Sequence, residues 1–122
     1  MADYSTIKGF SVETLASDPY ATAIEAGTWA SGGSLNTGVM LAAGFGASQT
    51  ASLKTGGEPS FKAATETYNG TAWTEVADLN TARRSLMGFG TTAAGIAASG
   101  SSSGAPTGSP LCESWNGTSW TE

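Results

Sequence analysis

The sequence predicts an all-β protein built from repeated antiparallel units, and three observations point to this class. The stretch from residue 65 to residue 75 returns almost unchanged 47 positions later, from 112 to 122. A longer similarity, offset by 44 positions, relates residues 29–56 to residues 73–100. Charged residues make up only 12% of the chain and glycine contributes 17 of its 122 residues, a composition that suits short strands better than helices. Self-similarity at a fixed period is typical of a repeat protein.

Each copy of the shorter stretch is expected to form a β-hairpin. An Asn-Gly pair between two runs of β-branched and aromatic residues is the strongest short-range hairpin signal, because a type I′ turn needs φ > 0 at both central residues. With a two-residue loop, Tyr68 lies opposite Thr71, and Tyr68 and Trp73 become diagonal neighbours on one face. Aromatic cross-strand pairs contribute roughly 0.2–1 kcal/mol over an alanine pair. The predicted turn residues are Asn69, Gly70, Asn116 and Gly117.

The recurring aromatic residues are the predicted core of the repeats. They keep the same spacing in both hairpins, so each hairpin is expected to lay an indole on a shared apolar surface. The alternative is that the rings are exposed and stack on sugars, which would give several equivalent binding sites. The residues concerned are Trp29, Tyr68, Trp73, Trp115 and Trp120.

The longer repeat predicts four short strands in each unit. The positions that match at an offset of 44 are Leu35-Asn36-Thr37 with Leu79-Asn80-Thr81, Gly44-Phe45-Gly46 with Gly88-Phe89-Gly90, Trp29 with Trp73, and Gly56 with Gly100. The offset then rises to 47, which places three added residues within the Ser/Gly/Pro tract 101–110, as in a surface loop. Four strands in a repeat of this length are typical of a β-propeller blade. The small residues of 41–48 and 91–99 are expected to let neighbouring sheets approach closely.

The chain is expected to divide into an N-terminal arm, residues 1–28, and about two repeats, residues 29–72 and 73–119, within a segment 29–122 that ends on an open hairpin. The arm shares nothing with the repeats, and its apolar side chains are too few to form a core. It is therefore expected to be extended and to order against a later part of the chain or a partner. A frayed terminus is the alternative. The predicted anchoring residues are Ile7, Phe10, Val12 and Leu15.

Charge and residue usage argue against several functional classes. The formal net charge is −5, and the five basic residues are scattered apart from Arg83 and Arg84, so nucleic acid is not expected as a partner. The chain has no histidine, which is the commonest metal ligand and general base. Its single cysteine, Cys112, excludes an internal disulfide and is expected to be a small buried strand residue. We therefore expect no catalytic, cofactor-binding or metal-binding residues, and no cofactor.

The carboxylates and the chain start are interpreted in the same way. The acidic pairs Glu66/Glu75 and Glu113/Glu122 flank hairpin strand ends, so they are expected to be solvated rather than to act as the acid and base of a glycosidase. No apolar run approaches the length of a membrane span. The first residues lack the basic start and apolar block of a signal peptide. Synthesis in a cytoplasm, without membrane insertion, is therefore expected.

Two blocks of the sequence resemble kelch-type repeats. The first is Glu66-x-Tyr68-Asn69-Gly70-Thr71-x-Trp73-Thr74, and the second is Leu79-Asn80-Thr81-Ala82-Arg83, which is followed by Gly-Phe-Gly and a closing Ser99-Gly100. More narrowly, the chain is similar to kelch-like repeat proteins of marine tailed bacteriophages, in which such units recur behind a short non-repeating N-terminus. The resemblance covers nearly the whole chain. It implies propeller-type antiparallel blades in an incomplete propeller, since a closed ring takes roughly 4–8 blades.

The chain departs from the kelch pattern in two places. The Gly-Gly pair of the pattern is present as Gly56-Gly57 in the first unit, but Ser99-Gly100 stands in the second. The first unit also has no arginine to match Arg83, so a bracing role of that arginine is expected to be absent there. Three ways of completing the sheets stay open: further repeats in a longer protein, a homotrimer with two blades from each copy, or packing on another virion protein.

The resemblance implies a virion structural protein, a tail or head fibre or appendage component that attaches through residues 1–28 and displays its repeats for host contact. Its location would be the virion, after synthesis in the host cytoplasm, and its partners other virion proteins and a host-surface glycan. A carbohydrate-binding module of β-propeller type and a capsid decoration protein are the alternatives. Some kelch propellers are oxidases, but those need a copper site with histidines, so no enzyme activity is expected.

Overall fold

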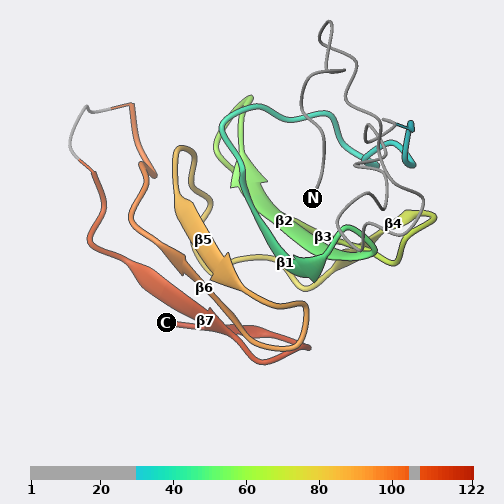
Figure 1. The fold of residues 1–122 in the computed structure, drawn as a ribbon. Helices are drawn as coiled ribbons and strands as arrows, with labels where there is room; N and C mark the ends of the chain where they lie inside the picture. Colours follow the sequence, from blue (N-terminus) through green and yellow to red (C-terminus); the bar gives the residue numbers. More distant parts are fainter. Residues whose placement is uncertain (1–29, 105–107) are drawn as a thin grey trace, which may run out of the picture. The chain divides into compact units, whose positions relative to one another are not determined.

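A computed structural model describes residues 30–104 and 108–122 of the chain (Figure 1). The repeats lie in a compact unit of residues 31–122. The predicted anchoring arm, with Ile7, Phe10, Val12 and Leu15, and the predicted core residue Trp29 fall outside the described residues.

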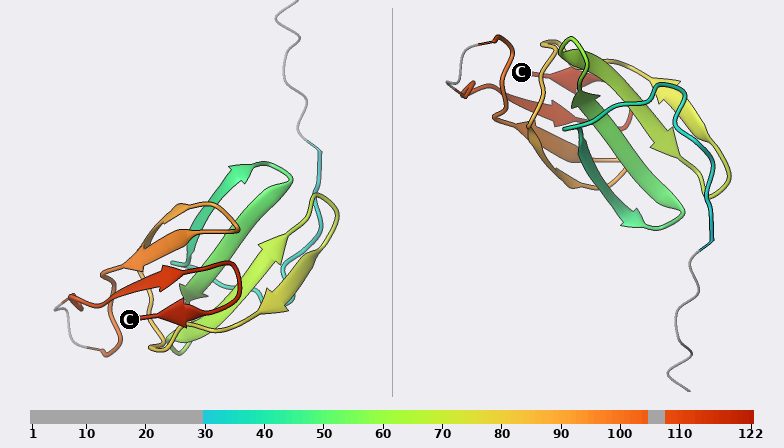
Figure 2. Two further views of the ribbon diagram at one scale, coloured as in Figure 1. Left: turned by 90° about the horizontal axis from the view of Figure 1, so that it is seen from below. Right: turned by 90° about the horizontal axis from the view of Figure 1, so that it is seen from above.

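The described part of the chain is all-β, as predicted, and no helix occurs in it. Its eight strands form two antiparallel four-stranded sheets, each with its strands in sequence order (Figures 1 and 2). The first sheet contains β1 (Ala43–Ser48), β2 (Ala51–Gly57), β3 (Lys62–Tyr68) and β4 (Trp73–Val76). The second contains β5 (Met87–Gly90), β6 (Gly95–Ala98), β7 (Cys112–Trp115) and β8 (Trp120–Thr121). Four strands per repeat is thus correct, and propeller closure stays a prediction.

The sheets and the sequence repeats are phased differently. The first sheet runs from Ala43 to Val76, so the boundary expected between residues 72 and 73 falls inside its last hairpin. The tryptophan strand therefore closes a sheet instead of opening the next one. The Leu-Asn-Thr bend lies in the connection that precedes β1 and again in the connection between β4 and β5.

The hairpin register differs from the expected one by two residues. Tyr68 pairs directly with Trp73, so the loop has four residues, 69–72, and the two rings lie opposite each other. The reason is the asparagine side chain: Asn69 Oδ1 accepts hydrogen bonds of 2.9 Å from the backbone N–H groups two and three residues on. Gly70 has a φ of 95°, whereas Asn69 does not adopt the positive φ that a type I′ turn requires. The second hairpin has the same form, with Trp115 opposite Trp120.

The equivalent of Gly100 is Gly57 and not Gly56, which corrects the sequence alignment by one residue. Isolated bridges join Met40 to Glu58 and Arg84 to Ser101, so the offset here is 43 positions. The segment between the paired residues Gly90 and Gly95 is one residue shorter than that between the equivalent pair Gly46 and Ser52, where β1 has a bulge, and the later insertion therefore comprises four residues instead of three. A Cβ on Gly100 would lie 2.7 Å from the carbonyl oxygen of Arg84, which explains why glycine is needed there.

One face of the first sheet packs on one face of the second to form the core. Phe45 of β1 lies over Gly88 and Gly95, where an added Cβ would come within 2.5 and 2.4 Å of its ring. Glycine at Gly95 thus allows the close approach predicted for this segment. The core residues are Ala43, Leu53, Leu79, Leu86, Ala97, Trp115 and Trp120, with Phe45, Ala63 and Val76 packed against them.

The connection between the sheets also holds them together. Its backbone donates from Leu79 N to Ala63 O at 3.0 Å and from Arg83 N to Lys62 O at 3.0 Å. Arg84 forms an ion pair with Glu58. These partners all belong to the first sheet or its loops, whereas Asn80 and Arg83 of the same connection bond to Glu113 of β7. The connection therefore links the two sheets by hydrogen bonds in addition to the apolar packing.

Candidate functional site

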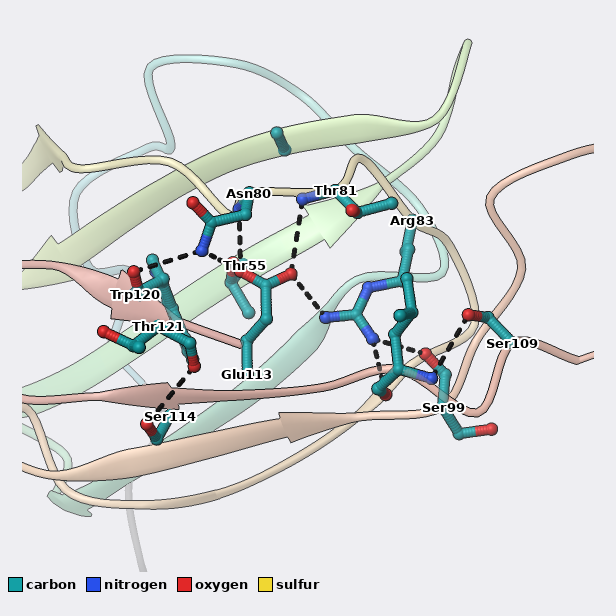
Figure 3. A network of polar contacts seen from close by, with 12 residues as sticks. Thr55, Asn80, Thr81, Arg83, Ser99, Ser109, Glu113, Ser114, Trp120 and Thr121 are labelled. Carbon is teal, nitrogen blue, oxygen red and sulfur yellow. Dashed lines mark hydrogen bonds and ion pairs between the residues drawn. The ribbon is translucent and has the colours of Figure 1, made fainter.

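The most elaborate polar cluster of the described residues surrounds the carboxylate of Glu113 in β7 (Figure 3). Glu113 is fully buried. Its Oε2 accepts from Asn80 N at 2.7 Å and Asn80 Nδ2 at 3.0 Å, and its Oε1 accepts from Thr81 N at 3.3 Å. Arg83 Nη2 donates to Oε1 at 2.8 Å. Four donors therefore neutralise and fix a carboxylate that has no contact with solvent.

The same cluster is present around Glu66 in β3. Asn36 N and Nδ2 donate to Glu66 Oε2 at 2.8 and 3.0 Å, and Thr37 N donates to Oε1 at 3.3 Å. In addition, Asn36 Nδ2 donates to the Trp73 carbonyl at 3.0 Å. Asn80 Nδ2 makes the equivalent bond to the Trp120 carbonyl at 3.1 Å. Each Leu-Asn-Thr bend thus ties the third and fourth strands of its own sheet.

The cation that balances the buried glutamate comes from a connection in one unit and from a strand in the other. Arg83 precedes β5 and pairs with Glu113, whereas Lys54 lies in β2, with its Nζ 3.6 Å from Glu66 Oε1. The register places Lys54 opposite Glu66, and Ala97 occupies the corresponding position in the second sheet. The first unit therefore lacks the arginine brace, as expected, and Lys54 on the neighbouring strand supplies the balancing charge there instead.

Arg83 is fully enclosed, as is its partner Glu113. Its Nη1 donates to the carbonyl oxygens of Ser99 at 3.0 Å and Leu111 at 2.8 Å. Its Nε is buried without a hydrogen-bond partner among the described residues. Since a buried ion pair costs desolvation energy that its attraction only partly returns, this arginine is held chiefly by the number of its bonds.

The environment of Glu66 favours its ionised form. Burial acts to raise the pKa of Glu66, but the backbone N–H groups of Asn36 and Thr37, the Lys54 ammonium and the Asn36 side chain together lower it below its usual value of 4.5. Glu66 and Glu113 are thus buried, and the expectation that they are solvated strand ends is wrong. Glu75, which pairs with Glu66 across the hairpin, is exposed, as expected.

The predicted core aromatics fall into two environments. The rings of Trp115 and Trp120 are 5.2 Å apart and only 3% and 5% exposed, because the first sheet covers them. Trp120 Nε1 donates to Thr65 Oγ1 of that sheet at 3.1 Å. The rings of Tyr68 and Trp73 are 5.1 Å apart and half-buried, since they lie on the opposite face of the first sheet. A flat ligand has no access to the indoles of the second sheet.

Two further observations concern reactive and metal-binding side chains. Cys112 lies in β7 but is exposed, so its predicted strand position is right and its predicted burial is wrong. Across residues 30–104 and 108–122, no three histidine, cysteine, aspartate or glutamate side chains gather as a metal site would require. The same residues include no helix with the length and apolar character to cross a membrane.

Sequence reasoning missed the twin buried networks. The available signal was the paired recurrence of Glu66 as Glu113 and of Asn36 as Asn80, each keeping its residue type in the matching position. Lys54 carried no such signal, because its equivalent is alanine.

No protein-family model matches the chain, and no curated protein matches it either.

Proposed function

We propose that this chain is a structural protein of a bacteriophage virion, a component of a tail or head fibre or appendage. It attaches through its N-terminal arm, residues 1–28, and displays kelch-like, propeller-type blades for host contact. The observation that carries the proposal is the repetition of one four-stranded unit with one buried Glu-Asn-Thr network. Those glutamate, asparagine and threonine residues belong to the blocks on which the kelch-like resemblance rests.

The physical properties of the unit suit a display scaffold. The networks fix the Leu-Asn-Thr bends by bonds that span about thirty residues of sequence, as between Asn80 and Glu113 with a separation of 33. The Ser/Gly/Pro tract 101–110, where the two repeats differ in length, is the segment that can vary without loss of the repeat pattern. Proteins with this division of roles carry their recognition residues on loops. Other virion proteins and a host-surface glycan are the partners that fit this role.

Localisation on purified particles tests the proposal. Immunogold labelling or cryo-electron microscopy of intact virions should place the chain on a tail or head appendage, and mass spectrometry of purified virions should recover its peptides. Recovery from the infected-cell cytosol alone, with none on particles, would rule the proposal out. Density on the capsid lattice, away from appendages, would instead favour the capsid decoration protein.

A carbohydrate-binding module is the second candidate, and the half-buried pair of Tyr68 and Trp73 favours it. Partly exposed aromatic rings stack on the apolar faces of sugars. Glycan-array binding that is lost on Trp73→Ala would support this function. Binding that survives the substitution would argue against stacking at this pair. Trp120 is not a suitable target for this test, because it is buried and its removal would disturb the core.

A further inference from the structure

Each sheet has two different faces, and within the chain only one face of each is covered by the other sheet. Where the two sheets meet, the face of the first sheet carries Phe45, and the face of the second sheet carries Gly88 and Gly95, which leave room for the Phe45 ring. The contact therefore joins two unlike faces: a phenylalanine, which we call the knob, and the space above two small residues, which we call the groove. Because the two sheets are equivalent, the outer face of the second sheet is of the knob kind and the outer face of the first sheet is of the groove kind. Neither outer face is covered by a partner sheet among the described residues.

The free face of the second sheet carries the unused knob. Phe89 occupies the position of Phe45 in the repeat and is 54% exposed, and Met87 beside it is 66% exposed. Ile96 of β6 pairs with Phe89 and lies on the same face. Large apolar side chains gathered on one sheet face are typical of an interaction surface.

The free face of the first sheet carries the unused groove. Gly44 and Ser52 take the positions of Gly88 and Gly95, as the strand registers show. An open groove of about 480 Å³ lies there, lined by Gly44, Gly46, Ser52 and Trp73 among others. A Cβ on Gly44 would meet nothing closer than 3.9 Å, so the space above this strand is open.

We propose that the free face of the second sheet in one copy of the chain packs on the free face of the first sheet in another copy, with Phe89 seated over Gly44 and Ser52. The occupant is a second copy because the chain carries both complementary faces and already uses the same contact internally. The joint is heterologous, so it propagates until a ring closes or a filament forms. Since a propeller ring takes roughly 4–8 blades, two to four copies would close one. The inference does not depend on the proposed function.

Two variants of the full chain test each face separately. Phe89→Glu places a charge on the knob, and Gly44→Val fills the groove with a residue that suits a strand, at a position where an added Cβ meets nothing closer than 3.9 Å. Sedimentation velocity should show the wild-type chain at a multiple of its 12.2 kDa mass. Each variant should weaken association by about tenfold or more, as for a residue central to an interface. Thr118→Glu, in an exposed hairpin loop, adds the same charge elsewhere and should leave association unchanged.

Mixing the two variants gives the sharpest result. Phe89→Glu keeps an intact groove and Gly44→Val keeps an intact knob. At a concentration at which each variant alone is monomeric, the mixture should therefore form a one-to-one dimer. Circular dichroism of each variant confirms that it is folded. A wild-type chain that stays at 12.2 kDa at all concentrations would overturn the proposal, whether the N-terminal arm or nothing occupies the groove. Association that both variants retain at full strength would overturn it as well.

Discussion

Removing the charge of Glu113 should be the most damaging conservative substitution in this chain. Glu113→Gln keeps the shape of the side chain, but it leaves the Arg83 guanidinium fully buried without a counter-charge. In the wild type, Asn80 N, Asn80 Nδ2 and Thr81 N donate to the two carboxylate oxygens of Glu113. Glutamine replaces one of these oxygens by an NH₂ group, which is itself a donor and cannot accept their hydrogen bonds. Removing one partner of a buried ion pair costs about 3–5 kcal/mol. Because a domain of this size is stable by about 5–15 kcal/mol in total, much of its stability would be lost.

Urea unfolding followed by tryptophan fluorescence measures this effect, since Trp115 and Trp120 are buried in the same sheet. The matched control is Glu75→Gln, an exposed glutamate in the equivalent hairpin, for which a change within about 0.5 kcal/mol is expected. All unfolding experiments should use one protein concentration, because association shifts apparent stability.

A double-mutant cycle separates the ion pair from the rest of the network. Arg83→Met combined with Glu113→Gln should cost less than the sum of the two single substitutions, because the second removes a charge that the first has left unpaired. A Glu113→Gln variant as stable as Glu75→Gln would refute the argument that this network holds the second sheet. Strict additivity in the cycle would refute the coupling between the two charges.

Three further predictions follow from single contacts. The lowered pKa of Glu66 means that its stabilising contribution is present above its usual pKa of 4.5 and is lost as pH falls toward the lowered value, so wild-type stability minus that of Glu66→Gln should shrink over this range in acid unfolding curves. Gly95→Ala forces a Cβ within 2.4 Å of the Phe45 ring and should destabilise the fold by about 1–3 kcal/mol; an unchanged melting temperature would contradict the packing described. Gly70→Ala, at a φ of 95°, should lower the melting temperature, whereas Gly38→Ala, with open space and no positive φ, should not; equal effects would count against the turn geometry.

The strand pattern was predictable because it depends on local residue types and on a repeat that the sequence states twice. The hairpins between β3 and β4 and between β7 and β8 occur where the Asn-Gly pairs predicted them. The register was not predictable from the same signal. A two-residue turn and the observed four-residue loop both contain Asn69 and Gly70, and the choice depends on where the Asn69 side-chain oxygen bonds.

The recurrence of the glutamates and asparagines marked the networks in the sequence, but it did not show that these residues meet or are buried. Glutamate near a strand end is usually solvated, and the donors that bury Glu113 stand some thirty positions earlier in the sequence, in a connection outside its hairpin. The exposed position of Cys112 was equally hidden, because strand alternation gives two faces and only the packing of the sheets decides which is covered.

The different origins of the two buried cations limit how the repeats can be exchanged during evolution. Val39 of the first repeat stands where the second has Arg83, and Ala97 of the second stands where the first has Lys54. A hybrid repeat that combines Val39 with Ala97 would leave its buried glutamate without a cation, and the reciprocal hybrid would bury Arg83 together with Lys54. Viable exchanges must therefore keep the connection and the first two strands of one copy as a single inherited block. The two repeats are alike in fold and yet not interchangeable part by part.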